Sequence, residues 1–228
     1  MHRRFSRGLA LLSAFALSGC TGNLSALSPA GPSASAIATL WWIMLIAGLA
    51  IFAATTMALA VAWWRPAWLG QRRSRTLILW GGLVLPSAIL VALVGSAFAL
   101  GERLLVRRDA PARIQIEAVA RQWQWEFRYP GGSTSLDILH LPAGEDVDLV
   151  VTTEDVIHSL WVPRLGGKID AIPGHRNRIR LHADVPGRFG GICAEFCGER
   201  HAEMHFSVEA HEEPAFMNQL RQLGRNDP

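Results

Sequence analysis

The stretch Cys193-Ala-Glu-Phe-Cys197-Gly-Glu-Arg-His201-Ala-Glu-Met204 brings two thiols, an imidazole and a thioether into one short segment. A second imidazole lies upstream, at His158 in the segment Ile-His-Ser-Leu-Trp-Val-Pro. Sulfur and imidazole ligands select copper over hard cations. Because a pair of thiolates can bridge two metal ions, the pattern predicts a binuclear copper centre of the electron-transfer type.

Two other chemistries compete for these residues. A disulfide between Cys193 and Cys197 is the commoner use of paired cysteines outside the cytoplasm, but it leaves His201 and Met204 unexplained. A structural zinc site uses cysteine and histidine and has no need of methionine. The joint occurrence of all four side chains therefore favours copper.

Five further histidines lie in or near the same region, and we expect none of them to bind the copper. His182 falls in an alternating strand pattern and reads as a side chain on a sheet face. His205 directly follows Met204, so in an extended chain it points the opposite way. The five are His140, His175, His182, His205 and His211.

The N-terminus has the layout of a secretory signal. A basic stretch (His2, Arg3, Arg4 and Arg7) precedes an apolar run over residues 9–17. The run ends in Leu17-Ser18-Gly19-Cys20, which resembles a bacterial lipoprotein cleavage box. We therefore expect a lipoprotein-type signal peptide at 1–19 and lipid on Cys20; an ordinary signal and an uncleaved anchor are the alternatives.

Two long apolar stretches predict a transmembrane hairpin. A Ser/Pro/Ala/Gly-rich linker is expected at 20–36, followed by helices at 37–64 and 76–101, each longer than the ~20 residues that cross a bilayer. The arginine-rich connector between them belongs on the cytoplasmic side. With the signal sequence outside, two crossings place the C-terminal domain outside as well.

Alternating apolar and polar residues after Pro111 predict β-strands. The pattern holds at 114–119, 147–151 and 177–181, with turns at 142–144 and 186–187. Short strands at this spacing indicate an all-β sandwich over 112–212, followed by a C-terminal tail at 213–228 with a short surface helix.

Trp123 and Trp125 lie in one predicted strand, in Trp123-Gln-Trp125-Glu-Phe127. We expect one of the two indoles to be buried and the other exposed. An exposed tryptophan often marks a contact site.

The motifs together resemble one family. Cys-x-Glu-x-Cys-x3-His-x2-Met, preceded by His-Ser-x-x-Val-Pro and by Gly-Gly-Lys168-Ile-Asp170-Ala-Ile-Pro-Gly-x-x-Asn177, resembles subunit II of haem–copper cytochrome c oxidases. The resemblance covers nearly the whole chain. It implies that the sandwich is a Greek-key cupredoxin-like domain, with the metal loop between its final strands.

The resemblance also implies a role for each site residue. Cys193 and Cys197 would bridge the two coppers of a CuA centre, and His158 and His201 would each bind one copper. Met204 would complete one copper and the backbone carbonyl of Glu195 the other. The Glu195 side chain would help to hold a magnesium ion shared with subunit I, and Trp123 would receive the electron from cytochrome c.

The implied function is electron entry into a respiratory terminal oxidase, a proton-translocating oxidoreductase. Electrons would come from a separate soluble or membrane-bound cytochrome c, since the sequence has no Cys-x-x-Cys-His haem motif. They would pass to haem in subunit I, where oxygen is reduced to water. Subunit I and other oxidase subunits are the expected partners, with no nucleic acid. The expected location is the bacterial plasma membrane, with the copper domain periplasmic.

Three other function classes share parts of this pattern. A quinol oxidase subunit II needs no copper ligands, and a nitrous-oxide-reductase-like enzyme needs a large further catalytic domain. A membrane-anchored copper chaperone or thiol exchanger could use Cys193 and Cys197 alone, with a single copper or a disulfide.

Acidic side chains in the β region could steer a basic cytochrome c. The formal net charge of +3 does not oppose this, because ten of the 21 arginines lie in the signal and beside the expected membrane spans, outside the β region. The candidates are Asp137, Glu145, Asp146, Asp148, Glu154 and Asp155.

Overall fold

The computed structural model describes residues 21–65, 71–104 and 112–226. They fall into two units, one covering Thr39–Leu105 and the other combining the residues up to Ala38 with the C-terminal region. The expected signal peptide 1–19 and Cys20 lie outside the described residues.

Two helical segments are long and apolar enough to cross a membrane. The first is α2 (Pro32–Trp64), and the second joins α3 (Gln71–Leu79), a π-helical turn η3 (Trp80–Val84) and α4 (Leu85–Leu104). Most of their described side chains are exposed, as side chains that face lipid would be, although Ala34 and Ala38 near the start of α2 are buried. The π turn, in which the Leu85 N–H bonds to the Trp80 carbonyl, ends two residues before Pro86. A proline has no N–H to donate, so the helix hydrogen-bonding pattern must change near it.

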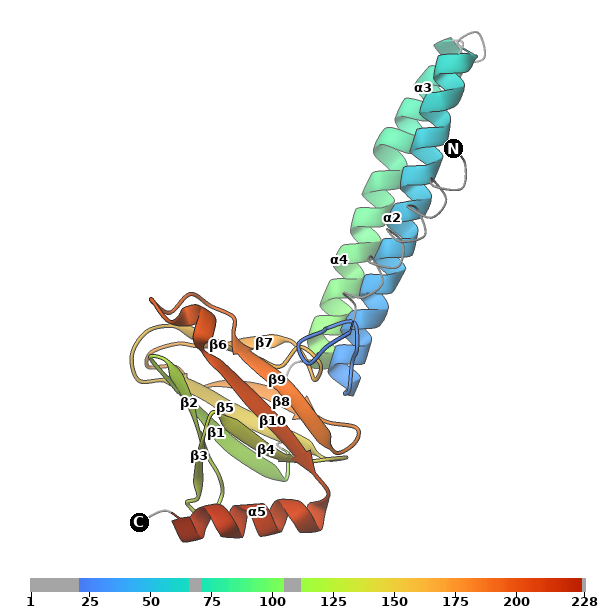
Figure 1. Ribbon diagram of the computed structural model, residues 1–228. Coiled ribbons are helices and arrows are strands. Elements are labelled where there is room, and N and C mark those ends of the chain that lie inside the picture. The colour runs from blue at the N-terminus through green and yellow to red at the C-terminus, as the bar shows by residue number, and fades with distance from the viewer. Residues whose placement is uncertain (1–20, 66–70, 105–111, 227–228) are drawn as a thin grey trace, which may run out of the picture. The chain divides into compact units, whose positions relative to one another are not determined.

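The C-terminal region folds as two five-stranded sheets (Figure 1). The first has the order β3-β2-β1-β5-β8 and the second the order β4-β10-β9-β6-β7. The bounds in the first sheet are β1 (Ile114–Arg121), β2 (Gln124–Arg128), β3 (Thr134–Leu136), β5 (Asp146–Thr153) and β8 (Asn177–His182). Those in the second are β4 (Ile138–Pro142), β6 (His158–Trp161), β7 (Lys168–Ala171), β9 (Gly187–Cys193) and β10 (His205–His211).

Long crossovers between the sheets give the sandwich its topology. β1 pairs with β5 in parallel, and β10 pairs with β4 in parallel, while the other pairs are antiparallel. The predicted strands at 114–119, 147–151 and 177–181 are confirmed as β1, β5 and β8. Helix α5 (Glu213–Asn226) follows β10 and lies across one end of the strands (Figure 1). The metal loop precedes β10, so it lies at the opposite end.

The core is aromatic and aliphatic. Trp125 and Phe127 of β2 are fully buried and pack against Phe206 of β10, with ring centroids 5.8 and 5.5 Å from it. Ile116 and Leu149, from neighbouring strands, are fully buried in the same cluster. In β2, the apolar residues of the alternating sequence pattern are the buried ones, and the polar residues between them are partly exposed.

The segment before α2 is held against the sandwich by backbone hydrogen bonds. The Ala30 N–H donates to the Arg164 carbonyl at 2.7 Å, and the Asp184 N–H donates to the Ala30 carbonyl at 2.9 Å. Gly31 fits there because a Cβ at this position would collide with the backbone carbonyl of His182. Part of the segment predicted as a linker at 20–36 is therefore packed, and α2 begins at Pro32.

Candidate metal centre

Strand pairing brings the distant His158 to the cysteine loop. His158 begins β6, and β6 pairs with β9 so that Leu160 lies opposite Cys193. The loop that leaves Cys193 carries Cys197 and passes through a 3-10 turn, η4 (His201–Glu203), to Met204. The Cys193 N–H donates to the Met204 carbonyl at 3.0 Å and closes the loop.

Five of the candidate ligand side chains meet at this loop. The Sγ atoms of Cys193 and Cys197 lie 3.8 Å apart. His158 Nδ1 lies 3.8 Å from the Cys193 sulfur, and His201 Nδ1 lies 3.6 Å from the Cys197 sulfur. Met204 Sδ lies 3.7 Å from the Cys197 sulfur. The structure thus brings together the side chains that the sequence pattern selected.

The centre is shielded from solvent. His158 is 0%, Met204 1%, Cys197 3% and Cys193 5% exposed. The two thiols are free, since 3.8 Å is far beyond the ~2.05 Å bond of a disulfide. It is also less than twice a metal–thiolate bond of about 2.3 Å, so both sulfurs can reach the same metal ions. The donor set therefore fits a binuclear copper group.

The two thiols differ in how readily they ionise. Burial opposes ionisation of Cys193, but hydrogen bonding from His158 and from backbone groups outweighs it and lowers the pKa of this thiol to about 6. Burial raises the pKa of Cys197, and the negative charge of Cys193 raises it further, to about 12. Two adjacent thiolates therefore need a compensating positive charge, which bound metal ions supply.

Asp155 orients the His158 ring. Its Oδ1 lies 2.8 Å from His158 Nε2, and this contact turns the other ring nitrogen, Nδ1, toward the Cys193 sulfur. The Val156 N–H and the Thr153 hydroxyl also donate to Oδ1. The sequence reading did not assign this role to Asp155; the only signal is its position three residues before His158, which is a weak one.

The Cys197 carbonyl accepts two side-chain hydrogen bonds from the β1–β2 turn. Gln122 Nε2 donates at 2.8 Å and the Trp123 indole Nε1 at 3.2 Å. The next residue, Gly198, has φ +119°, a conformation that favours glycine, and it lies against the Trp123 ring. Trp125 of β2 is the fully buried indole. Contrary to the expectation from the sequence, Trp123 does not lie in the strand but in the turn before β2, and for that reason it is only partly buried. The sequence reading did not foresee the contact of Gln122, although this residue is adjacent to Trp123.

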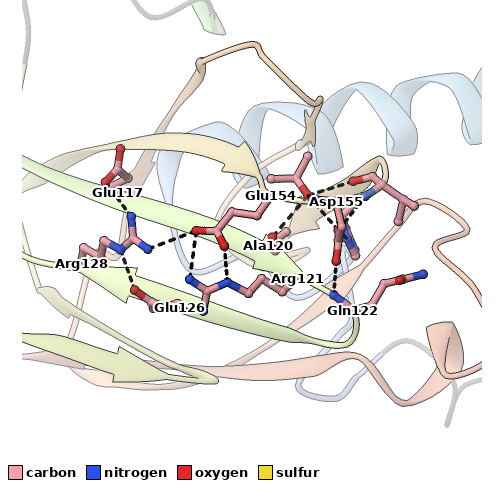
Figure 2. A network of polar contacts seen from close by, with 11 residues as sticks. Glu117, Ala120, Arg121, Gln122, Glu126, Arg128, Glu154 and Asp155 are labelled. Carbon is pink, nitrogen blue, oxygen red and sulfur yellow. Dashed lines mark hydrogen bonds and ion pairs between the residues drawn. The ribbon is translucent and has the colours of Figure 1, made fainter.

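A network of ion pairs fixes this turn against the β5–β6 loop (Figure 2). Arg121 donates to Glu154 at 2.6 Å and to Glu126 at 2.7 Å, and Arg128 Nη2 donates to Glu154 at 3.4 Å. The Gln122 N–H donates to Asp155 Oδ2 at 2.7 Å, so Asp155 contacts both the turn and His158. The turn that carries Trp123 and the loop that carries His158 therefore form one connected structure.

The Glu195 carbonyl and side chain point to different neighbours. The carbonyl oxygen lies 3.2 Å from the Cys193 sulfur. The carboxylate is half exposed and lies 3.9 Å from Lys168 Nζ, which also lies 3.4 Å from Asp170 Oδ1. A carboxylate pair thus shares one lysine beside the centre.

The acidic side chains proposed to steer a cytochrome do not form one surface patch. Asp148 is 1% exposed and accepts two hydrogen bonds from Arg180. Asp146 begins β5 and Glu154 follows its end, so they lie at opposite ends of an eight-residue strand. Glu154 is also paired with two arginines, as described above. Counting acids along the sequence ignored these basic partners.

The other histidines do not join the sulfur site. Among the described residues, His158, Cys193 and Cys197 form one group whose ligand atoms lie within 4.8 Å of one another. His140 and His211 belong to a second group with Glu209. His182 pairs with Asp146, and the His175 ring lies at hydrogen-bond distance from the Pro173 carbonyl.

Comparison with known proteins agrees with this site. The family model described as cytochrome c oxidase subunit II, periplasmic domain, matches residues 134–211. The cytochrome c oxidase subunit 2 of Albinaria turrita is 30% identical over 157 residues, which are 59% of this chain and 69% of the relative. The chain belongs to the cytochrome c oxidase subunit II family. The two helices and the copper-type ligand set are thus those of a subunit II.

A bacterial relative and a solved structure extend the match. Subunit 2 of Alkalihalophilus pseudofirmus is 34% identical over 214 residues, 85% of this chain. The chain spans 61% of that relative's length. The crystal structure of the periplasmic domain of subunit II of cytochrome oxidase from Bradyrhizobium japonicum is 29% identical, with a TM-score of 0.50. It covers 52% of this chain and 99% of its own, and it confirms the cupredoxin-like sandwich.

Proposed function

We propose that this subunit II accepts single electrons from cytochrome c at a binuclear copper centre and passes them to haem in subunit I, where oxygen is reduced to water. One observation carries the proposal. Two free, buried cysteine sulfurs lie 3.8 Å apart, with an imidazole nitrogen within 3.8 Å of each and a thioether beside one.

The ligand roles follow from these contacts. Cys193 and Cys197 would hold both coppers, and His158 and His201 would each bind one of them. Met204, whose sulfur lies beside that of Cys197, and the Glu195 carbonyl, which lies beside the Cys193 sulfur, would complete the ligand set. When bound, a binuclear copper group supplies a one-electron store whose charge is spread over two ions. Burial of the ligands excludes water, so little has to reorganise when the charge changes.

Trp123 gives the electron a route from the surface. Its indole bonds to the carbonyl of the bridging residue Cys197, and its ring is partly exposed and lies 5.9 Å from the Arg200 guanidinium. Gln122 fixes the same carbonyl. The donor cytochrome would therefore dock over Trp123, beside the exposed Phe196.

The carboxylates near the centre would face a second ion. Glu195 and Asp170, which share Lys168, supply hard oxygen ligands of the kind that magnesium prefers. The proposal is that a magnesium ion is held between Glu195 and subunit I. The copper domain would lie on the periplasmic side of the bacterial plasma membrane, in a complex with subunit I and further subunits.

The test uses the assembled oxidase. Replacing Met204 with leucine should slow the oxidation of cytochrome c at least tenfold, whereas the Met217→Leu control, on the exposed face of α5, should leave the rate unchanged. Cys197→Ser should remove copper from subunit II and abolish the activity. Full activity in Cys197→Ser would contradict the role of this centre in electron entry. A parent chain that holds a single copper, or that exchanges thiols through a Cys193–Cys197 disulfide, would instead favour the chaperone or exchanger class.

A further inference from the structure

A second cluster of metal-ligand side chains lies at the other end of β10. His140 is on β4, and Glu209 and His211 are on β10, with Glu209 directly opposite His140 in the parallel register. Residues two apart on a strand share a face, so Glu209 and His211 project together, away from the core residues Val208 and Ala210. The pairing of β4 with β10 therefore gathers two imidazoles and a carboxylate.

The atoms of this cluster are spaced as ligands of one ion would be. His140 Nδ1 lies 2.9 Å from His211 Nε2 and 3.7 Å from Glu209 Oε2, and His211 Nε2 lies 4.0 Å from the same oxygen. Ligand atoms about 2.0–2.1 Å from a tetrahedral zinc ion are about 3.4 Å apart. The three observed separations lie on both sides of that value.

Burial and charge also suit a metal ion. The His140 side chain is 4% exposed, while Glu209 and His211 are 33% and 22% exposed, so the cluster is open to solvent on one side. Burial, and then the neighbouring His211, lower the pKa of His140 and keep its ring neutral. Arg188 faces the cluster at 3.8 Å from Glu209 Oε1, on the oxygen that is turned from the histidines.

We propose that His140, Glu209 and His211 form a second metal site that binds a divalent transition-metal ion, with Zn²⁺ as the best match. Two imidazoles and one carboxylate, with a water in the fourth position, are a zinc donor set. These three ligands contain no sulfur, so the site lacks the soft ligands by which the cysteine loop selects copper. His211 is seven residues beyond Met204 on an extended strand, roughly 23 Å away, so both sites can be filled together.

The bound ion would tie the edge of the second sheet to its C-terminal strand. β4 is an edge strand, and edge strands have one side without a sheet partner. The site lies where β10 leads into α5. Zinc binding should therefore raise the thermal unfolding temperature of the sandwich.

The test is a zinc titration of the full-length chain in detergent, with the copper centre loaded first so that its cysteines are occupied. Zinc per chain is measured after gel filtration, together with the unfolding temperature. We expect one zinc ion per chain and a higher unfolding temperature. His211→Asn and Glu209→Gln should each weaken zinc binding at least tenfold and remove the temperature rise.

His182→Asn is the matched control, because this partly exposed histidine lies 2.9 Å from Asp146 but has no second imidazole nearby in the described structure. It should bind zinc as the parent chain does. The electron paramagnetic resonance signal of the copper centre reports whether each variant is folded. If His211→Asn loses that signal and is therefore misfolded, the zinc affinity of Glu209→Gln is the measurement that tests the proposal. The proposal is overturned if the parent chain binds no zinc, or if folded His211→Asn and Glu209→Gln bind it as tightly as His182→Asn does.

Discussion

The indole nitrogen of Trp123 lies 3.2 Å from the backbone carbonyl oxygen of Cys197. This hydrogen bond links a partly exposed aromatic ring to the backbone of a cysteine of the candidate metal centre. It joins segments that are 74 residues apart, and it is supported by the parallel contact from Gln122.

Trp123→Phe should slow electron entry without removing copper. The ring remains, but its hydrogen bond to the Cys197 carbonyl is lost. We expect the rate of electron transfer from reduced cytochrome c to fall at least tenfold, measured by stopped-flow absorbance, with an unchanged copper spectrum. Trp161→Phe is the control, because the Trp161 indole also bonds a backbone carbonyl at 3.2 Å, that of Gly166. An equal loss in both variants would contradict a specific role for Trp123.

Asp155→Asn should weaken copper binding. The carboxylate fixes the ring and tautomer of His158, and loss of such a partner typically lowers metal affinity by about 10–100-fold. Competition with a copper chelator measures the change. Asp184→Asn serves as the control, since Asp184 is exposed and lies near His182. Unaltered copper affinity in Asp155→Asn would show that the His158 ring is held by packing alone.

The Asp148–Arg180 pair should make stability depend on pH in the acid range. Burial alone would raise the pKa of Asp148, but hydrogen bonds from Arg180 and from the Ala112 N–H outweigh it and lower this pKa. A carboxyl group whose folded pKa is depressed contributes stability that is fully present above its unfolded pKa of about 3.9 and is lost as the pH falls through the folded value.

Asp148→Asn should therefore destabilise the sandwich at pH 7 by roughly 2–3 kcal/mol, because Arg180 loses its buried partner. The difference from the parent chain should shrink below about pH 4. Thermal unfolding followed by circular dichroism across this range tests it, with the half-exposed Asp146 as the site of the control variant, Asp146→Asn. A difference that stayed constant down to pH 2 would rule out the proton linkage.

Gly31→Ala should release the segment before α2 from the sandwich. A Cβ at Gly31 would collide with the His182 carbonyl, which is backbone and cannot rotate aside. We expect faster limited proteolysis near residues 22–31. Gly48→Ala is the control, because a Cβ there meets nothing within 4 Å. Equal proteolysis of both variants would mean that the segment is not anchored through this contact.

The convergence of the candidate copper ligands could be predicted because most of them are close together in sequence and unusual in type. Cys193, Cys197, His201 and Met204 occupy one loop, and only His158 has to be brought in by strand pairing. The strand pattern was equally readable, since burial alternates in β2 as it does in the sequence.

Contacts that depend on tertiary structure were not readable. Examples are the hydrogen bonds between Asp155 and His158 and between Gln122 and the Cys197 carbonyl. The spacing of these residues along the sequence does not indicate that they are in contact. The prediction of a single acidic surface patch was wrong for the same reason. The sequence does not show that Asp148 is buried and paired with Arg180. His140 lies beside His211 because β4 pairs in parallel with β10, and these two strands are far apart in the sequence.

The most direct test of the central claim is the electron paramagnetic resonance spectrum of the copper-loaded full-length chain, recorded together with copper per chain. We expect two coppers that share one unpaired electron, seen as hyperfine splitting from both nuclei, with Cys197→Ser losing the signal and Met217→Leu keeping it. A single-copper spectrum, or a Cys193–Cys197 disulfide that binds no copper, would contradict it.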